Sequence, residues 1–254
     1  MNSVAVIIPI YKSELSFLEK KSLTQTCSVL FNYDIIVIKP KNLQLNHLQE
    51  GFPLIKFQSF NDSFFVSKRS YNRLMLSSDF YERFLDYEYI LICQLDAYVF
   101  KDELVEWCNK GYDYIGAPWI PKPLYTKLII RDYRRVLHWW KKIRNKPSTQ
   151  SLNNKIGNGG FSLRKVSTHY KATITYNKKI DYYLSQQHRL YNEDVFWATE
   201  VPEFVYPTLP EAIQFSFEKY PKYCFKINNN KLPFGCYAWH KTKMRKFWKP
   251  IIGF

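Results

Sequence analysis

The sequence predicts an α/β fold in which a mostly parallel, Rossmann-like sheet is flanked by helices. Short apolar, β-branched runs alternate with helical patterns in the order β-α-β-α-β-α-β, which is typical of a parallel open sheet. The chain has 254 residues and is 46% hydrophobic and 18% aromatic, which is enough to bury one full core. We therefore expect a single domain.

Four apolar runs are the predicted strands: Val4–Ile10, Ile35–Ile38, Tyr89–Leu95 and Tyr112–Ala117. The predicted helices lie between them. Ser16 stands three residues before Glu19, which is the spacing of a capping box, and predicts a helix to about Asn32. Apolar residues at helical intervals predict a second helix over 67–85, and Asp102 predicts the cap of a third helix through Asn109.

Cysteine usage and hydropathy limit the class of protein. The five cysteines are odd in number and contain no C-x-x-C pair, which argues against a disulfide framework and a structural zinc site and favours reduced packing residues. The apolar start is broken by Pro9 and has no basic leader, and no apolar run reaches about eighteen residues. We expect a cytoplasmic protein without a signal peptide or membrane span.

The net charge of +15 is concentrated in two segments. Residues 121–150 carry 9 Lys+Arg against 1 acid and residues 241–254 carry 5 against none, so together they hold 13 of the 15 excess charges. A near-neutral body with two basic segments does not indicate a nucleic-acid groove. Within 131–144 the apolar residues fall on one face, which predicts a basic amphipathic helix that, with Lys243–Lys249, contacts an anionic membrane. Packing of that apolar face against the domain is the open alternative.

Asp96 is a candidate ligand-binding residue because it follows the most hydrophobic predicted strand. Ligands of open α/β sheets bind beyond the carboxyl ends of the strands. A carboxylate there can bind a divalent cation or a ribose hydroxyl, and it can equally serve only as a turn or capping residue.

A glycine-rich loop and an acid pair predict a transferase site. Gly157, Gly159 and Gly160 are three of only eight glycines, and Glu193-Asp194 follows about thirty residues later. Such a loop lets backbone approach a ligand, and an acid can accept a proton from it. A tight hairpin and a helix start that favours acids are the simpler readings. Dinucleotide-binding and P-loop glycine motifs are absent from the sequence, and no glycine follows Ser162 as in a nucleophile elbow.

Four motifs resemble those of GT-A nucleotide-sugar glycosyltransferases, and in particular a little-characterised microbial family of that class. They are Gln94-Leu95-Asp96-Ala97-Tyr98, Gly116-Ala117-Pro118-Trp119, Gly157-Asn158-Gly159-Gly160-Phe161-Ser162-Leu163-Arg164 and Asn192-Glu193-Asp194-Val195-Phe196. The resemblance covers roughly residues 4–119 and 156–240. It implies a GT-A fold with a nucleotide-sugar donor.

The resemblance also implies which residues form the site. Donor-binding residues would be Pro9, Ile10, Tyr11, Arg69, Arg73, Gln94, Asp96, Ala97 and Tyr98. Acceptor-binding or sugar-binding residues would be Trp119, Asn158, Gly159, Gly160 and Phe161. Asp194 would deprotonate the acceptor hydroxyl, and Glu193 would orient it.

The predicted metal site departs from the family pattern. The resemblance implies that Asp96 and His240 hold a divalent cation, Mn²⁺ or Mg²⁺, yet the second aspartate of the Asp-x-Asp element is Tyr98. Because hard cations take several oxygen ligands, the need for a cation is open. Cationic side chains at Lys68, Arg69, Arg73 or Lys241 are the alternative means of stabilising the leaving group.

The predicted organisation is one domain: a nucleotide-sugar half over 1–119, a basic insertion over 120–155, an acceptor and catalytic half over 156–240, and a basic aromatic tail over 241–254. The predicted function is an inverting glycosyltransferase of cell-surface polysaccharide synthesis with a glycan or lipid-linked acceptor, cytoplasmic or peripheral at the inner face of the membrane. A sugar nucleotidyltransferase and a non-catalytic RNA-binding or membrane-binding module are the alternatives, with no nucleic-acid partner expected for the preferred reading.

Overall fold

The computed structural model describes residues 3–122, 139–140, 143–144 and 148–254. Most of the basic helix predicted over 131–144 therefore lies outside the described residues. Of that segment, Trp139, Trp140, Ile143 and Arg144 are described, and all four are exposed.

The described residues form a six-stranded central sheet with the order β3-β2-β1-β4-β7-β6. The strands are β1 (Val4–Pro9), β2 (Asp34–Pro40), β3 (Lys56–Phe60), β4 (Tyr89–Cys93), β6 (Tyr114–Gly116) and β7 (Phe161–Lys165). Strands β1 to β4 pair in parallel, and β7 runs antiparallel to both of its neighbours, β4 and β6. The predicted mostly parallel sheet is confirmed, and β3 and β7 are additions to the four predicted strands.

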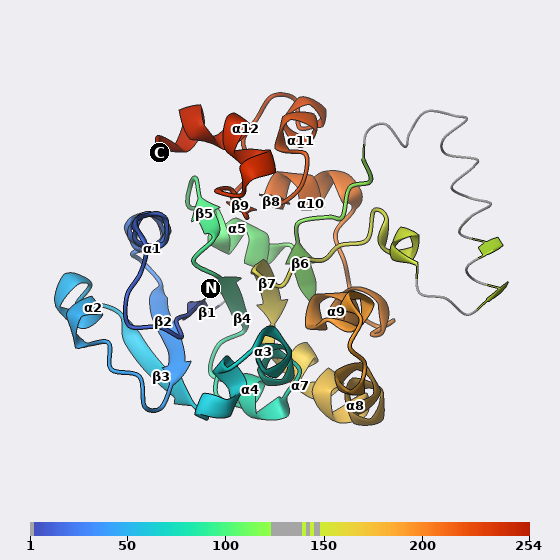
Figure 1. Ribbon diagram of the computed structural model, residues 1–254, viewed down its shortest axis with the longest axis horizontal. Coiled ribbons are helices and arrows are strands. Elements are labelled where there is room, and N and C mark those ends of the chain that lie inside the picture. The colour runs from blue at the N-terminus through green and yellow to red at the C-terminus, as the bar shows by residue number, and fades with distance from the viewer. Residues whose placement is uncertain (1–2, 123–138, 141–142, 145–147) are drawn as a thin grey trace.

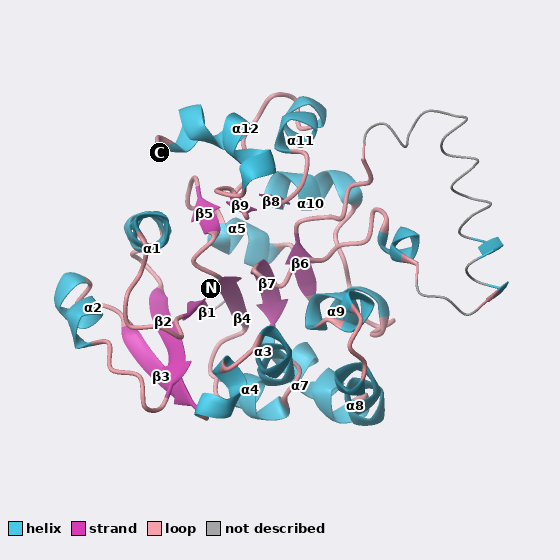
Figure 2. Cartoon of the chain, in the orientation of Figure 1, coloured by secondary structure: helices cyan, strands magenta, loops and turns pink. Residues whose placement is uncertain are grey.

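Helices cover both faces of this sheet (Figure 2). Side chains alternate along β1, so that Val4, Val6 and Ile8 face one core and Ala5 and Ile7 face the other. The first core packs against α1 (Phe17–Val29), α2 (Asn46–Gly51), α5 (Leu104–Asn109) and α10 (Leu209–Phe215). The second packs against α3 (Lys68–Met75), α4 (Ser78–Glu82), α7 (Val166–Thr175), α8 (Asn177–Ser185) and α9 (Glu193–Thr199).

The helix starts test the capping predictions. Ser16 and Glu19 form the predicted capping box of α1. Asp102 accepts a hydrogen bond from the backbone N–H of Leu104, the first residue of α5. The single helix predicted over 67–85 is wrong: Ser77 accepts a hydrogen bond from the Phe80 N–H and starts α4 as a separate helix. A serine side chain that bonds locally to backbone favours a new cap over a continuous helix.

A second, three-stranded sheet of the described residues comprises β5 (Ala97–Val99), β8 (Ser216–Phe217) and β9 (Gly235–Tyr237) in the order β5-β9-β8. Beyond it lie α11 (Pro221–Ile227) and α12 (Thr242–Ile252), which contact each other (Figure 1). Trp239 and Trp248 are fully buried in the core between these elements. The tail hypothesis is therefore wrong for Trp248, because this ring packs inside the protein and does not face a membrane.

Two further expectations can be compared with the structure. All five cysteines are free thiols, and four of them are buried, as expected of packing residues. Among the described residues, none of the helices combines the length and apolar character needed to cross a bilayer.

Candidate active site

A cavity of about 680 Å³ opens at the carboxyl ends of β1 and β4. Its walls include Asp96 at one strand end, Gly159 and Gly160 of the glycine-rich loop, and the acid pair Glu193 and Asp194 at the start of α9. Pro9 lines it as the last residue of β1, Tyr11 lines it beyond that strand, and Gln94 lines it beyond β4. The three motifs that were separate in the sequence thus share one cleft.

The glycine-rich loop is shaped by contacts with the other cavity walls. Asn158 adopts a left-handed conformation (φ 72°), and its Oδ1 accepts a hydrogen bond of 2.9 Å from the Gly160 N–H. A Cβ at Gly160 would stand 2.1 Å from the Tyr237 ring, and one at Gly159 would stand 2.4 Å from Glu193 Oε2. These two glycines are needed because side chains of the protein itself press on the loop.

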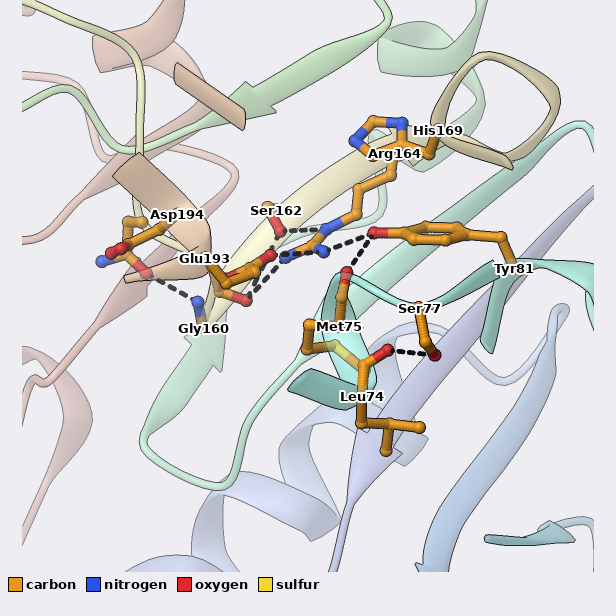
Figure 3. Close-up of polar contacts among 12 residues, drawn as sticks. Leu74, Met75, Ser77, Tyr81, Gly160, Ser162, Arg164, His169, Glu193 and Asp194 are labelled. Atoms are coloured by element: carbon orange, nitrogen blue, oxygen red, sulfur yellow. Dashed lines mark hydrogen bonds and ion pairs between the residues drawn. The ribbon is translucent and has the colours of Figure 1, made fainter. Parts of the chain in front are cut away.

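Arg164 joins the loop to the acid pair (Figure 3). This arginine lies on β7 with no exposed surface, and its Nη1 is 2.6 Å from Glu193 Oε1 in an ion pair. It donates hydrogen bonds to the hydroxyls of Tyr81 (2.9 Å) and Ser162 (3.1 Å) and to the Gly159 carbonyl oxygen (3.4 Å). Each charge of the buried pair is thus compensated, as burial of ions requires.

Glu193 has partners that differ from the predicted ones. Its side chain is almost fully buried and bonded to Arg164, whereas orientation of an acceptor hydroxyl was predicted. The contacts favour a role in positioning the loop and the start of α9. This role was not visible in the sequence, because nothing near Glu193 in the chain marks Arg164 as its partner.

Asp194 differs from Glu193 in having no ion pair among the described residues. Burial, together with the negative charge of Glu193, raises its pKa from an ordinary value of 3.8 to about 7, and Lys68 opposes this shift. Its Oδ1 accepts a hydrogen bond from the Val195 N–H, which fixes the carboxyl at the start of α9. A half-buried carboxylate with a pKa near neutrality suits a general base.

Asp96 lies against the turn that follows β9. Its carbonyl oxygen accepts a hydrogen bond from the Ala238 N–H (2.8 Å). Burial raises the pKa of its carboxyl, and the positive charges of Lys241 and His240 oppose that shift. The structure therefore brings Asp96 and His240 together, as the predicted metal site required.

Seven predicted site residues do not line the cavity. Ile10 and Ala97 are fully buried, since they belong to the apolar core beside β1 and β5. Phe161 is also fully buried and packs against Phe215 and Phe234, because it begins β7 facing the core. These three side chains have no access to a ligand.

The other four are held elsewhere. Tyr98 packs edge-on against Trp239, with ring centroids 5.8 Å apart. Trp119 packs over Gly157, where a Cβ would stand 2.2 Å from its ring. Arg69 donates hydrogen bonds to the Leu184 carbonyl oxygen, and Arg73 is exposed on α3. The two arginines were predicted from their closeness in sequence to Lys68, but helical rotation turns them away from the cavity.

Four further residues that were not predicted as site residues also line the cavity. Tyr71 and Asn72 line it from α3, Glu218 follows β8, and Tyr237 lies on β9. The Tyr237 hydroxyl donates a hydrogen bond of 3.0 Å to Gln94 Oε1. Tyr71 and Asn72 stand three and four positions after Lys68, so the helical period could have placed them on the same face of α3 as Lys68. Glu218 could not be found in this way, because β8 is only two residues long and has no sequence signal.

The donor set does not fit a divalent cation held by the protein alone. Among the described residues, no three His, Cys, Asp or Glu side chains are grouped as metal ligands. Asp96 and His240 are two candidates, and Tyr98, at the second aspartate position, faces Trp239. Mg²⁺ and Mn²⁺ favour about six ligands that are mostly oxygen.

The sheet order, the antiparallel β7 and the cleft at the strand ends match a GT-A fold, and solved structures agree. The galactosyltransferase LgtC, in complex with donor and acceptor sugar analogs, matches with a TM-score of 0.60 at 12% identity over 98% of this chain and 95% of that chain. Mouse xyloside xylosyltransferase 1 in its apo form matches with a TM-score of 0.55 at 12% identity, over 92% and 97%. The mannosyltransferase Ktr4p from S. cerevisiae, in complex with GDP, matches at 0.50 and 10% identity, over 80% and 67%.

The chain belongs to the family described as "Protein of unknown function (DUF5672)", whose model matches residues 54–237. That span includes the strand end at Asp96, the glycine-rich loop and the acid pair. Curated protein sequences gave no match. At identities of 10 to 12%, the solved structures show the fold of this chain.

Proposed function

We propose that this chain is a glycosyltransferase that moves a sugar from a nucleotide-sugar donor to a hydroxyl of a glycan or lipid-linked acceptor. One observation carries the proposal: Asp96, the glycine-rich loop and Asp194 line a single cavity at the carboxyl ends of parallel strands in a GT-A fold. Ligands of such sheets bind at this edge. The cavity volume of about 680 Å³ is within the range of small-molecule sites.

Asp194 is the proposed general base. Its pKa of about 7 leaves a substantial ionised fraction at neutral pH and keeps it basic enough to accept a proton from an acceptor hydroxyl. The hydroxyl oxygen then forms a bond to the anomeric carbon as the bond from that carbon to the diphosphate breaks. The contacts of Arg164 with Glu193 and with the Gly159 carbonyl oxygen hold the start of α9 against the glycine-rich loop, so that Asp194 stays at the cavity wall.

The donor is proposed to lie along the strand ends. Pro9 and Tyr11 at the end of β1, with Gln94 and Asp96 beyond β4, line this side of the cavity. Asn158, Gly159 and Gly160 form the wall that leads to Asp194 and would contact the transferred sugar or the acceptor. Direct displacement assisted by one base inverts the anomeric carbon, and proton NMR of the product tests this.

We further propose a membrane-peripheral location and a role in cell-surface polysaccharide synthesis, and the exposed cations of α12 support the location. Lys243, Lys246 and Lys249 are exposed on this helix, while Trp248 is buried. Such a surface is attracted to anionic lipid. Flotation with anionic vesicles tests the location, and an absence of binding at low salt contradicts it.

A nucleotide-release screen tests the function itself. Purified protein is incubated with common sugar nucleotides and mixed acceptors, with Mn²⁺ or with a chelator, and free nucleoside diphosphate is measured. We expect release from at least one donor, strongly reduced in Asp194→Asn. Release from none of the donors in either condition contradicts a glycosyltransferase, and a parallel assay with sugar phosphate and nucleoside triphosphate detects a nucleotidyltransferase.

A further inference from the structure

Two lysines on different elements line the cavity without an ion pair to a carboxylate among the described residues. Lys68 is the first residue of α3, and Lys241 directly precedes α12. By contrast, Lys12, which also lines the cavity, is bound to Glu19 with Nζ to Oε2 at 2.7 Å. Lys68 and Lys241 are therefore the lysines of this cavity that are available to a ligand.

The turn after β9 fixes Lys241 and His240 at the cavity. Tyr237 pairs with Ala97 across the small sheet, and the Ala238 N–H bonds to the Asp96 carbonyl oxygen. Ala238 has a φ of 57°, a left-handed conformation that is uncommon for a residue with a Cβ. Trp239 is then buried and donates from Nε1 to Ser22 Oγ at 3.1 Å. With Trp239 anchored inside, the next two residues are placed beside Asp96.

The side chains around Asp96 favour an anion over a divalent cation. Lys241 and His240 are the positive groups that act on its carboxyl, and Tyr98 is turned toward Trp239 and Phe100. A cation at the carboxylate would be repelled by the ammonium of Lys241. A diphosphate, in contrast, takes hydrogen bonds from lysine and histidine, and these charge-assisted bonds are among the strong ones.

We propose that Lys241, His240 and Lys68 bind the diphosphate of the nucleotide sugar directly, so that transfer needs no divalent cation held by the protein. This inference rests on the proposed function. As the bond from the anomeric carbon to the diphosphate oxygen breaks, its electron pair stays on that oxygen, and the new charge is met by Lys241. The acceptor proton goes to Asp194, and a nucleoside diphosphate leaves.

Calorimetric titration of the full chain tests this inference without any need for turnover. The probes are UDP, GDP and inorganic pyrophosphate, each titrated in EDTA and in Mn²⁺. We expect at least one probe to bind in EDTA with the affinity that it has in Mn²⁺. Lys241→Ala is expected to weaken that binding by about tenfold or more, as loss of a charge-assisted hydrogen bond does, and Lys241→Arg to restore part of it.

Lys243→Ala is the matched control, because Lys243 is exposed on α12 and does not line the cavity. It is expected to bind each probe as the unchanged protein does, and circular dichroism confirms that each variant is folded. Binding that appears only with Mn²⁺ overturns the inference and leaves the glycosyltransferase proposal standing. Equal binding by Lys241→Ala and the unchanged protein also overturns it. Absence of binding for all three probes in both conditions overturns both proposals.

Discussion

Replacement of Asp194 by asparagine should stabilise the protein at alkaline pH while removing its proposed base. The folded-state pKa of Asp194 is raised to about 7 from an ordinary 3.8, because burial and Glu193 penalise its charge. Below pH 3.8 both states bind the proton, and there is no penalty. Between pH 3.8 and about 7 the unfolded state ionises while the folded state keeps its proton, so the unfolding free energy falls through this range and is constant above it.

The size of this effect follows from the shift. A difference of about three pKa units corresponds to about 4 kcal/mol of unfolding free energy above pH 7. Asparagine keeps an oxygen for the Val195 N–H and has no charge to bury. The unfolding free energy of Asp194→Asn minus that of the unchanged protein should therefore increase by about 3 kcal/mol between pH 5 and pH 8. This advantage in stability corresponds to roughly 6 to 12 °C in Tm.

Thermal and urea unfolding at both pH values measure this advantage. Asp181→Asn on α8 is the matched control, because Asp181 is exposed, and its difference from the unchanged protein should be the same at pH 5 and pH 8. If the advantage of Asp194→Asn does not grow with pH, then Asp194 is not a buried acid of raised pKa. Asp194 is then also not a base with a pKa near neutrality.

Two further predictions concern the walls of the site. Arg164→Met leaves Glu193 buried without its cation and should lower the unfolding free energy by about 3 to 5 kcal/mol. The double variant Arg164→Met with Glu193→Leu should recover most of this loss. Equal losses in the single and double variants would contradict the ion pair. Gly160→Ala places a Cβ against the Tyr237 ring and should cost about 1 to 3 kcal/mol in urea unfolding. Gly51→Ala, with no atom within 4 Å of its Cβ, should stay within about 0.5 kcal/mol, and similar costs for both glycines contradict the packing described for the loop.

The fold class and the meeting of three motifs could be predicted, because local patterns determine them. Buried parallel strands are almost wholly apolar, as in β1 and β4, and the strand ends of such a sheet meet at one edge. The capping box at Ser16 is equally local, since it depends on two residues three positions apart.

The missed elements depend on contacts between distant residues. Strand β7 contains Arg164, which is typical of a surface position, and it becomes a core residue only because Glu193, Tyr81 and Ser162 surround it. Strand β3 is partly exposed and contains Lys56 and Gln58, so its sequence is a weak strand signal. The role of Glu193 was missed because it depends on Arg164, which is 29 positions away in the chain. Neither periodicity nor motif spacing identifies such a partner.

In the proposed reaction this cavity transfers a sugar, and Asp194 acts as the base. The most direct measurement compares the transfer rate and the nucleoside diphosphate affinity of the unchanged protein and Asp194→Asn, with the donor that the release screen selects. We expect a fall in kcat of about 100-fold or more with affinity nearly unchanged, since loss of a general base affects the chemical step. Transfer by Asp194→Asn at the normal rate, with the donor bound as before, would contradict it.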